Sequence, residues 1–326
     1  MAKKVVLAGG SGFLGRMLGR RLGAEGWEVV VLTRDTDKCP APDDIPAFRA
    51  VQWNGETGGA WTAELEGADA LVNLAGRSIN CVHSLENSRE ILESRLNAVK
   101  ALAKGWGRAK NPPALWLQCS ATGYYGNAGD RFCEESLPPG PGFLAEVCRR
   151  WEDAFQAVEL EGARRVVLRL GVVLDPDHGA LPALARLVRR FLGGAAGSGR
   201  QYLSWIHRDD VIAAFMAALT NPGMSGAYNV CSPAPVTNAE FMRELRGVLG
   251  RPWAPPAPEF VVRLAAGPMM GADPNLALHG QRCSPQRLLA TGFTFKQPAL
   301  GAALKDLLGA KRAGSDAAGE VATSRR

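Results

Sequence analysis

The residues best suited to chemistry near the start of this chain form a glycine-rich run, Gly9-Gly10-Ser11-Gly12-Phe13-Leu14-Gly15. Glycines let the backbone approach a phosphate group closely, and the N-terminus of a following helix adds free N–H groups and a partial positive charge. That combination is typical of a site for the pyrophosphate of a dinucleotide. The alternative is that the glycines only make a tight turn.

A second residue of chemical interest, Arg34, follows the apolar run Val29 to Leu32 and Thr33. An acid at this place holds the ribose 2′-hydroxyl of NAD(H), whereas an arginine pairs with the 2′-phosphate of NADP(H). Asp35 comes one position too late for the first role. The sequence therefore favours NADP(H), with a solvated loop arginine as the alternative interpretation.

The elements that position these residues are a strand, a helix and a second strand. Val5 to Ala8 is apolar, Leu14 to Leu22 repeats apolar residues at helical spacing, and the run from Val29 is a second strand. Further strands are expected at 48–53, 70–74, 114–119 and 165–170, with helices at 86–106 and 143–160. This alternation predicts an α/β fold, a doubly wound parallel Rossmann sheet with ligands at the carboxyl ends of its strands.

The alternation loosens after residue 175, which predicts a second unit. We expect residues 1–175, joined again by 206–230, to form the Rossmann domain. Residues 176–205 and 231–309 should form a small, partly discontinuous C-terminal substrate domain. Asp209 or Asp210 is the expected N-cap of a helix over 210–219, and Thr237 with Glu240 predicts a capping box. Residues 310–326 lack apolar content and should be a disordered tail.

The composition excludes several classes of protein. The net charge of +6 is spread over 326 residues without a basic stripe, which argues against nucleic acid as a partner. Seven scattered cysteines without a Cys-x-x-Cys pair indicate free thiols, with neither a disulfide framework nor a metal site. No apolar run approaches the ~18 residues of a membrane span, and the first strand leaves no room for a signal peptide. We expect a cytoplasmic protein.

Several short sequence motifs together resemble those of the extended short-chain dehydrogenase/reductase superfamily. They are the glycine run, Asn73-Leu74-Ala75-Gly76, Ser120 to Gly126, Arg169 to Leu174, Trp205 to Val211 and Tyr228 to Val230. More narrowly, the chain is similar to the epimerase-like family of YfcH or SDR39U type through residues 143–152, 197–211, 235–241 and 280–295. The resemblance extends from residue 4 to about residue 309. It implies a homodimer through the helices at 86–106 and 143–160.

The residues and the resemblance together predict a set of cofactor contacts. These are Gly9, Ser11, Gly12, Phe13, Leu14, Gly15, Thr33, Arg34, Leu74, Ala75, Gly76, Cys119 and Val172.

The catalytic pair of the superfamily is missing. Its reductases use a tyrosine as general acid or base and a lysine four residues later, because an unperturbed tyrosine is a poor base at neutral pH. The residues four positions after the four tyrosines here are Ala128, Gly129, Ile206 and Ser232. On the helix that begins at Phe143, the pair is replaced by Phe143 and Val147, or by Leu144 and Cys148 one register on.

Two other hydroxyls are the candidate catalytic groups. Ser120 matches the site serine of the superfamily when counted from the strand, although counting back from Tyr125 reaches Ala121 instead. Tyr125 is the best-placed tyrosine. His207 is expected to be a structural hydrogen-bonding residue. Leu203 stands where nucleotide-sugar enzymes carry an arginine, which weakens the case for a UDP-sugar.

Two functions follow from these observations. The first is an NADP(H)-binding epimerase or oxidoreductase that acts on a small polar substrate, such as a sugar, with a non-standard proton donor. The second is a catalytically silent NADP(H)-binding regulatory or scaffold protein, because the Tyr-Lys pair is missing.

Overall fold

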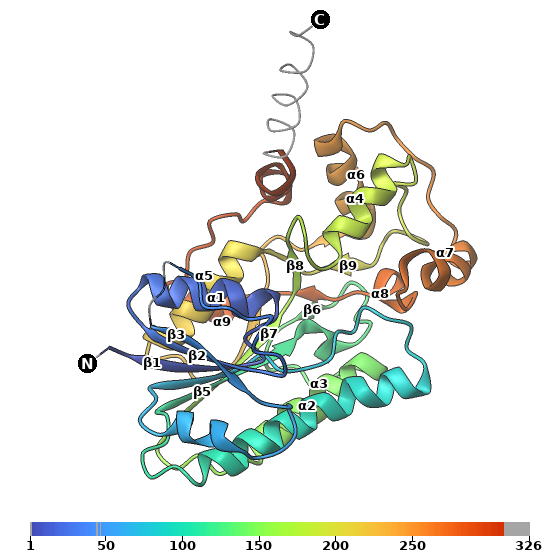
Figure 1. The fold of residues 1–326 in the computed structure, drawn as a ribbon. Helices are drawn as coiled ribbons and strands as arrows, with labels where there is room; N and C mark the ends of the chain where they lie inside the picture. The colour runs from blue at the N-terminus through green and yellow to red at the C-terminus, as the bar shows by residue number, and fades with distance from the viewer. Residues whose placement is uncertain (1, 44, 46, 310–326) are drawn as a thin grey trace, which may run out of the picture.

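A seven-stranded parallel sheet forms the centre of the computed structural model, which describes residues 2–43, 45 and 47–309. The strand order is β11-β7-β5-β4-β1-β2-β3. The strands are β1 Lys4–Ala8, β2 Glu28–Thr33, β3 Phe48–Gln52, β4 Ala70–Asn73, β5 Leu115–Ala121, β7 Arg164–Leu170 and β11 Gly226–Val230. The order reverses at β1, whose neighbours are β2 and β4, both parallel to it. This topology confirms the predicted doubly wound Rossmann sheet (Figure 1).

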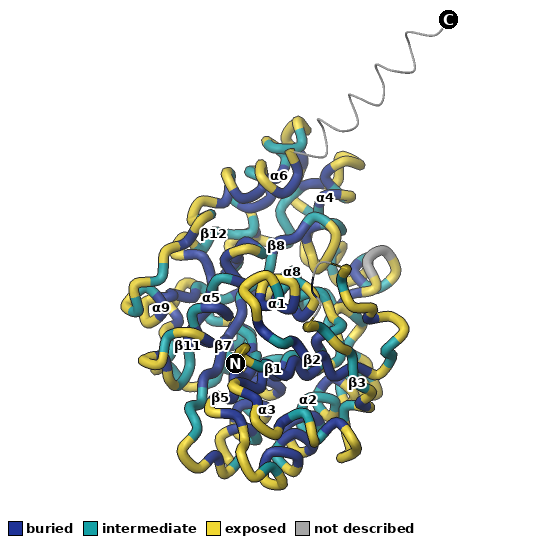
Figure 2. The backbone as a smooth tube through the Cα atoms, turned by 60° about the vertical axis from the view of Figure 1, so that its left-hand side comes forward, coloured by how far each residue is buried: buried dark blue, intermediate teal, exposed yellow. Residues whose placement is uncertain are grey.

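Helices cover both faces of the sheet. α1 Phe13–Ala24 and α5 Arg208–Thr220 pack on one face, and α2 Leu85–Trp106 and α3 Phe143–Gln156 pack on the other (Figure 1). Because side chains alternate along a strand, Val5 and Leu7 enter the core beneath α1 and α5. Val6 and Ala8 enter the core beneath α2 and α3. Figure 2 shows the strands of the sheet buried while many connecting loops are exposed.

A third apolar core lies beyond the carboxyl edge of the sheet. It joins α4 Leu181–Arg189, α6 Asn238–Leu249 and the helix over 300–309. Two small sheets lead into this unit. β8 Val172–Leu174 pairs in parallel with β10 Trp205–His207, and β9 Tyr202–Leu203 pairs antiparallel with β12 Val236–Thr237. The exact domain boundaries stay a prediction, and the tail expected at 310–326 lies outside the described residues.

The remaining elements lie along the loops. They are η1 Ala60–Leu65, η2 Thr122–Tyr125, β6 Phe132–Cys133, α7 Glu259–Ala265, η3 Ala266–Met270, α8 Asn275–Leu278, β13 Arg282–Cys283 and α9 Gln286–Ala290. β6 and β13 pair in parallel, so the 120–142 segment, expected to be irregular, is tied to the C-terminal part of the chain.

Tertiary contacts changed two predicted helix ends. α5 begins at Arg208, and its N-cap is His207, whose Nδ1 accepts from the N–H of Asp209 at 3.2 Å, so the expected aspartate cap was wrong. Asp210 is fully buried and instead accepts from the N–H groups of Lys296 and Gln297. α3 ends before residue 160, because the guanidinium of Arg165 binds the carbonyls of Phe155, Gln156 and Val158.

Other predicted contacts were correct. The capping box of Thr237 and Glu240 is formed, with both side chains bound to the backbone of the other residue. His207 makes the structural hydrogen bonds expected of it, including one between its Nε2 and Asp306 at 3.1 Å.

Candidate functional site

The glycine turn after β1 leaves a space that the protein itself does not fill. Gly9 has a φ of +75°, and its N–H donates to Leu32 at 3.0 Å, so the chain turns sharply here. Gly15 packs on the turn, where a Cβ would lie 2.4 Å from the Cα of Gly10. A Cβ on Gly12, by contrast, would meet only the carbonyl of Gly9, at 3.5 Å. Packing therefore explains Gly9 and Gly15, whereas the open side of Gly12 fits a ligand.

The N-terminus of α1 next to this space is open to an anion. Gly12 is the N-cap of this 12-residue helix, no side chain caps it, and its first turn has no acidic residue. The first N–H groups of a helix have no partner within it and carry part of the positive end of the helix dipole. The N–H groups of Phe13 and Leu14 are therefore available to the pyrophosphate of a dinucleotide.

The end of β2 separates an arginine from the acid that follows it. Thr33 is buried and donates to Oγ of Ser11 at 2.9 Å, which joins β2 to the glycine turn. Arg34 is exposed and forms no ion pair with any residue that the structure describes. Asp35 binds Nζ of Lys38 at 2.8 Å, and this contact lowers the pKa of the Asp35 carboxyl. The guanidinium of Arg34 is thus free to bind a phosphate.

The turn after β4 meets the glycine turn directly. A Cβ on Gly9 would lie 2.8 Å from the Cα of Ala75, so the two turns pack backbone against backbone. Asn73 fixes this geometry, because its Oδ1 accepts from the N–H of Ala75 at 3.1 Å and its Nδ2 donates to Gln118 at 3.0 Å. Leu74, Ala75 and Gly76 therefore continue the edge that the glycine turn begins.

Cys119 and Val172 have different surroundings. Cys119 lies near the end of β5, and burial raises the pKa of its thiol to about 12, so the thiol is protonated at neutral pH. Val172 opens β8 and packs against the third core. The predicted cofactor residues thus follow the carboxyl ends of β1, β2, β4 and β5, and Val172 follows β7, the neighbour of β5 in the sheet.

The two candidate catalytic hydroxyls are buried in one polar network. Oγ of Ser120 donates to Oε1 of Glu152 at 2.6 Å. The same carboxylate binds Nε and Nη2 of Arg169 at 2.9 and 2.8 Å. Tyr125 is fully buried; its hydroxyl donates to Asn229 and accepts from Arg169. Burial raises the pKa of Tyr125 well above the usual range. Both hydroxyls make hydrogen bonds that join separate elements of the fold, which argues against a direct catalytic role for either.

The place of the missing Tyr-Lys pair is apolar. A Cβ on Gly123 would lie 3.7 Å from Cβ of Leu144 and 3.9 Å from Sγ of Cys148. Leu144 and Cys148, one of the two possible positions of the pair, therefore lie beside the turn that follows β5. Burial raises the pKa of Cys148 to about 11. Neither side chain is a general base at neutral pH. The seven cysteines are free thiols.

Sequence reasoning missed a cation in this region, Arg95 of α2. Its Nη1 donates to the carbonyls of Arg77 and Ile91 at 2.9 and 2.8 Å. A Cβ on Gly76 would lie 3.1 Å from its Cζ, so the guanidinium lies directly against the turn after β4. The signal in the sequence is a cation on the apolar stripe of this helix, four residues after Ile91 and seven before Leu102.

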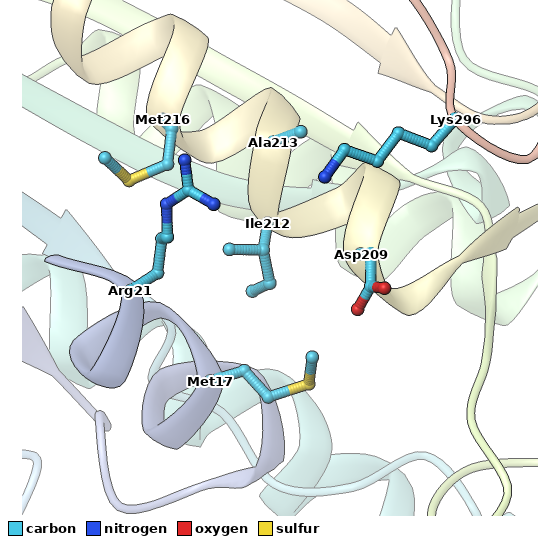
Figure 3. Close-up of a pocket in the computed structure, with 7 residues that line it drawn as sticks. All are labelled: Met17, Arg21, Asp209, Ile212, Ala213, Met216 and Lys296. Carbon is cyan, nitrogen blue, oxygen red and sulfur yellow. The ribbon is translucent and has the colours of Figure 1, made fainter. Parts of the chain in front are cut away.

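Two surface cavities lie beside α1. One of about 390 Å³ lies between α1 and α5 and is lined by Met17, Arg21, Asp209, Ile212, Ala213, Met216 and Lys296 (Figure 3). A second of about 490 Å³ includes Phe13, whose ring stacks on His178 at 4.6 Å. Only Phe13 among these lining residues belongs to the predicted cofactor set.

The described part of the chain has no cluster of three or more metal-ligating side chains. None of its helices is long and apolar enough to cross a bilayer.

Comparison with known proteins finds a family and close relatives in sequence. A model of the NAD dependent epimerase/dehydratase family matches residues 5–231, and a domain of unknown function, DUF1731, matches residues 257–307. The human epimerase family protein SDR39U1 is 34% identical over 309 residues, which are 94% of this chain and 99% of that protein. The epimerase family protein YfhF of Bacillus subtilis is 35% identical over 305 residues, covering 93% and 97% of the two chains.

Solved structures match as well. The crystal structure of human SDR39U1 with NADPH has a TM-score of 0.81 and 33% identity, covering 93% of this chain and 98% of that one. A nucleoside-diphosphate sugar epimerase from Corynebacterium glutamicum has a TM-score of 0.74 and 32% identity, covering 95% of this chain and 59% of that one.

Proposed function

This chain belongs to the NAD dependent epimerase/dehydratase family, and from that premise we propose that it binds NADP(H) and acts as an epimerase or oxidoreductase on a small polar substrate. The observation that carries the proposal is that the chain has both an open glycine turn after β1 and an arginine available for a phosphate after β2. Gly12 leaves room beside the uncapped N-terminus of α1, and Arg34 at the end of β2 forms no ion pair with the residues that the structure describes.

The ion pair between Asp35 and Lys38 favours NADP(H) over NAD(H). The Asp35 carboxylate pairs with Lys38 at 2.8 Å and not with Arg34, which leaves the Arg34 guanidinium open to a 2′-phosphate. A charge-assisted bond between a guanidinium and a phosphate contributes about 1.5–3 kcal/mol. The NADPH bound in the human relative supports the same cofactor. When bound, the nicotinamide supplies or accepts a hydride.

Proton transfer in this proposal does not pass through Ser120 or Tyr125. Ser120 is held by Glu152, and the Tyr125 hydroxyl already serves Asn229 and Arg169. We assign the proton to an ordered water or to a group of the substrate itself. The substrate is small and polar, and the similarity to a nucleoside-diphosphate sugar epimerase supports a sugar-like one.

Hydride transfer is tested with NADPH labelled at the nicotinamide C4 and a panel of aldehydes, ketones and sugars. The purified full-length protein should move label from the cofactor to at least one carbonyl compound. Label that stays on the cofactor with every compound, while binding is intact, would contradict catalysis but not cofactor binding.

The second candidate is a catalytically silent NADP(H)-binding regulator or scaffold. The observation that favours it is that the helix beginning at Phe143 offers no proton-transfer pair, whether the superfamily positions are counted as Phe143 and Val147 or as Leu144 and Cys148. A protein partner captured with the NADPH form should then bind the NADP⁺ form measurably less well. Equal binding of the two forms would count against a sensing role.

We also propose a homodimer through α2 and α3 in the cytoplasm. The inward faces of both helices pack on the sheet around Trp116, so only their outward faces are open to a second copy. Light scattering on the purified protein measures the dimer.

A further inference from the structure

The guanidinium of Arg95 is a cation without a counter-ion, placed against the turn after β4. It forms no ion pair with any described residue, and its Nη1 donates only to the two backbone carbonyls of Arg77 and Ile91. Its Cζ also lies over the ring of Trp151, 4.9 Å from the ring centroid, as in a cation–π contact. Burial lowers the pKa of this guanidinium.

The groups around Arg95 do not neutralise it. Cys119 and Cys148 are the titratable groups that interact with its charge, and burial raises the pKa of both thiols far above neutrality. The neighbouring Arg77 carries its own partners, with Nη2 donating to Asn87 at 2.7 Å and Nη1 paired with Glu90. A ligand bound next to the turn after β4 is therefore exposed to the positive charge of Arg95.

The sheet topology decides which part of the cofactor that is. A dinucleotide lies across the point where the strand order reverses, and here that point is β1. With the 2′-phosphate at Arg34 after β2, the adenosine half lies over β2. The nicotinamide half would then lie over the ends of β4 and β5, where Gly76 and Cys119 are close to Arg95.

We infer that Arg95 makes this site selective for the redox state of the cofactor, so that it binds NADPH more tightly than NADP⁺. The oxidised nicotinamide ring carries a positive charge and the reduced ring is neutral. A nearby cation that has no counter-ion among the described residues repels the oxidised ring by Coulomb's law. The inference rests on the NADP(H) binding proposed above but not on catalysis.

The test is calorimetric titration of the full-length protein with NADPH and with NADP⁺. The wild type should bind NADPH more tightly, and Arg95→Gln should lower the ratio of the two affinities about tenfold, as expected for one partly screened charge. Arg95→Lys keeps the charge and should keep most of the preference. Arg89→Gln is the matched control, because Arg89 lies on the same helix, is exposed and pairs with Glu93.

The outcomes separate the two proposals. Equal affinity of the wild type for both forms overturns the inference without any variant, even if Arg95→Gln fails to fold. An Arg95→Gln protein that loses affinity for both forms by the same factor also overturns it, because Arg95 would then only clamp the turn at Gly76. A wild type that binds neither form overturns the proposed cofactor itself.

Discussion

The hydroxyl of Tyr125 lies 2.8 Å from Oδ1 of Asn229, a residue 104 positions later in the chain. The same hydroxyl accepts from Nη1 of Arg169 at 2.9 Å. Since desolvation raises the pKa of the phenol, the group stays protonated and can donate to the amide oxygen throughout the neutral range. Tyr125 therefore bridges the turn after β5 to β7 and to the edge strand β11.

Removal of this bridge should cost stability. Tyr125→Phe leaves Asn229 Oδ1 and Arg169 Nη1 each without one partner in a buried place. We expect the free energy of unfolding to fall by about 1–3 kcal/mol, with the affinity for NADPH unchanged. Urea denaturation and calorimetry measure the two quantities. A stable Tyr125→Phe protein that has lost label transfer from NADPH would instead identify Tyr125 as the proton donor.

Substitution of Gly12 and of Gly15 should have different effects, one on cofactor binding and the other on stability. Gly12→Val meets open space within the protein at a φ of −70°, so the fold should remain stable while NADPH binding is lost. Gly15→Ala places a Cβ 2.4 Å from the Cα of Gly10, so it should lower the melting temperature. Thermal unfolding and cofactor titration of both variants distinguish the roles. A Gly12→Val protein that still binds NADPH would rule out the pyrophosphate site.

Arg34 should set the preference for the phosphorylated cofactor. Arg34→Ala removes a charge-assisted bond of about 1.5–3 kcal/mol, so the affinity for NADPH should fall roughly 10- to 100-fold while that for NADH changes little. Fluorescence titration with each cofactor gives both values. Arg89→Ala is the control, because this exposed arginine lies on α2 away from β2. Equal losses for NADPH and NADH would contradict the 2′-phosphate role.

Glu135 should make stability depend on pH. Burial raises the pKa of its carboxyl above the ordinary 4.5, even though the N–H of Asn229 and the charges of Arg287 and Arg169 oppose the shift. Between 4.5 and the raised pKa, the folded state holds a proton that the unfolded state has released. Stability contributed by this group is therefore lost as the pH rises through that window.

The matched variant for this effect is Glu135→Gln, which keeps an oxygen to accept from Asn229. Its melting temperature relative to the wild type should increase as the pH rises from about 4.5 toward neutrality. Thermal unfolding of both proteins across this range measures the difference. A constant difference would show that Glu135 has the same pKa in the folded and unfolded chains.

The cofactor edge could be predicted from the sequence because its signals are local. The strand, the glycine turn and α1 lie within 24 residues, and the arginine that selects the cofactor follows at the end of the next strand. Periodicity predicts such elements, and their alternation predicts a parallel sheet with helices on both faces. The missing Tyr-Lys pair is equally visible, because that motif is read from spacing alone.

The roles of the buried polar residues were decided only by the tertiary structure. The hydrogen-bond partners of Ser120, Tyr125 and Asp210 lie 32, 104 and 86 residues away in the sequence, so no local pattern predicts them. A hydroxyl at a strand end has the same sequence context whether it faces substrate or a buried carboxylate. Arg95 is similar: its position on an apolar stripe was visible, but its lack of a counter-ion depends on every element packed around it.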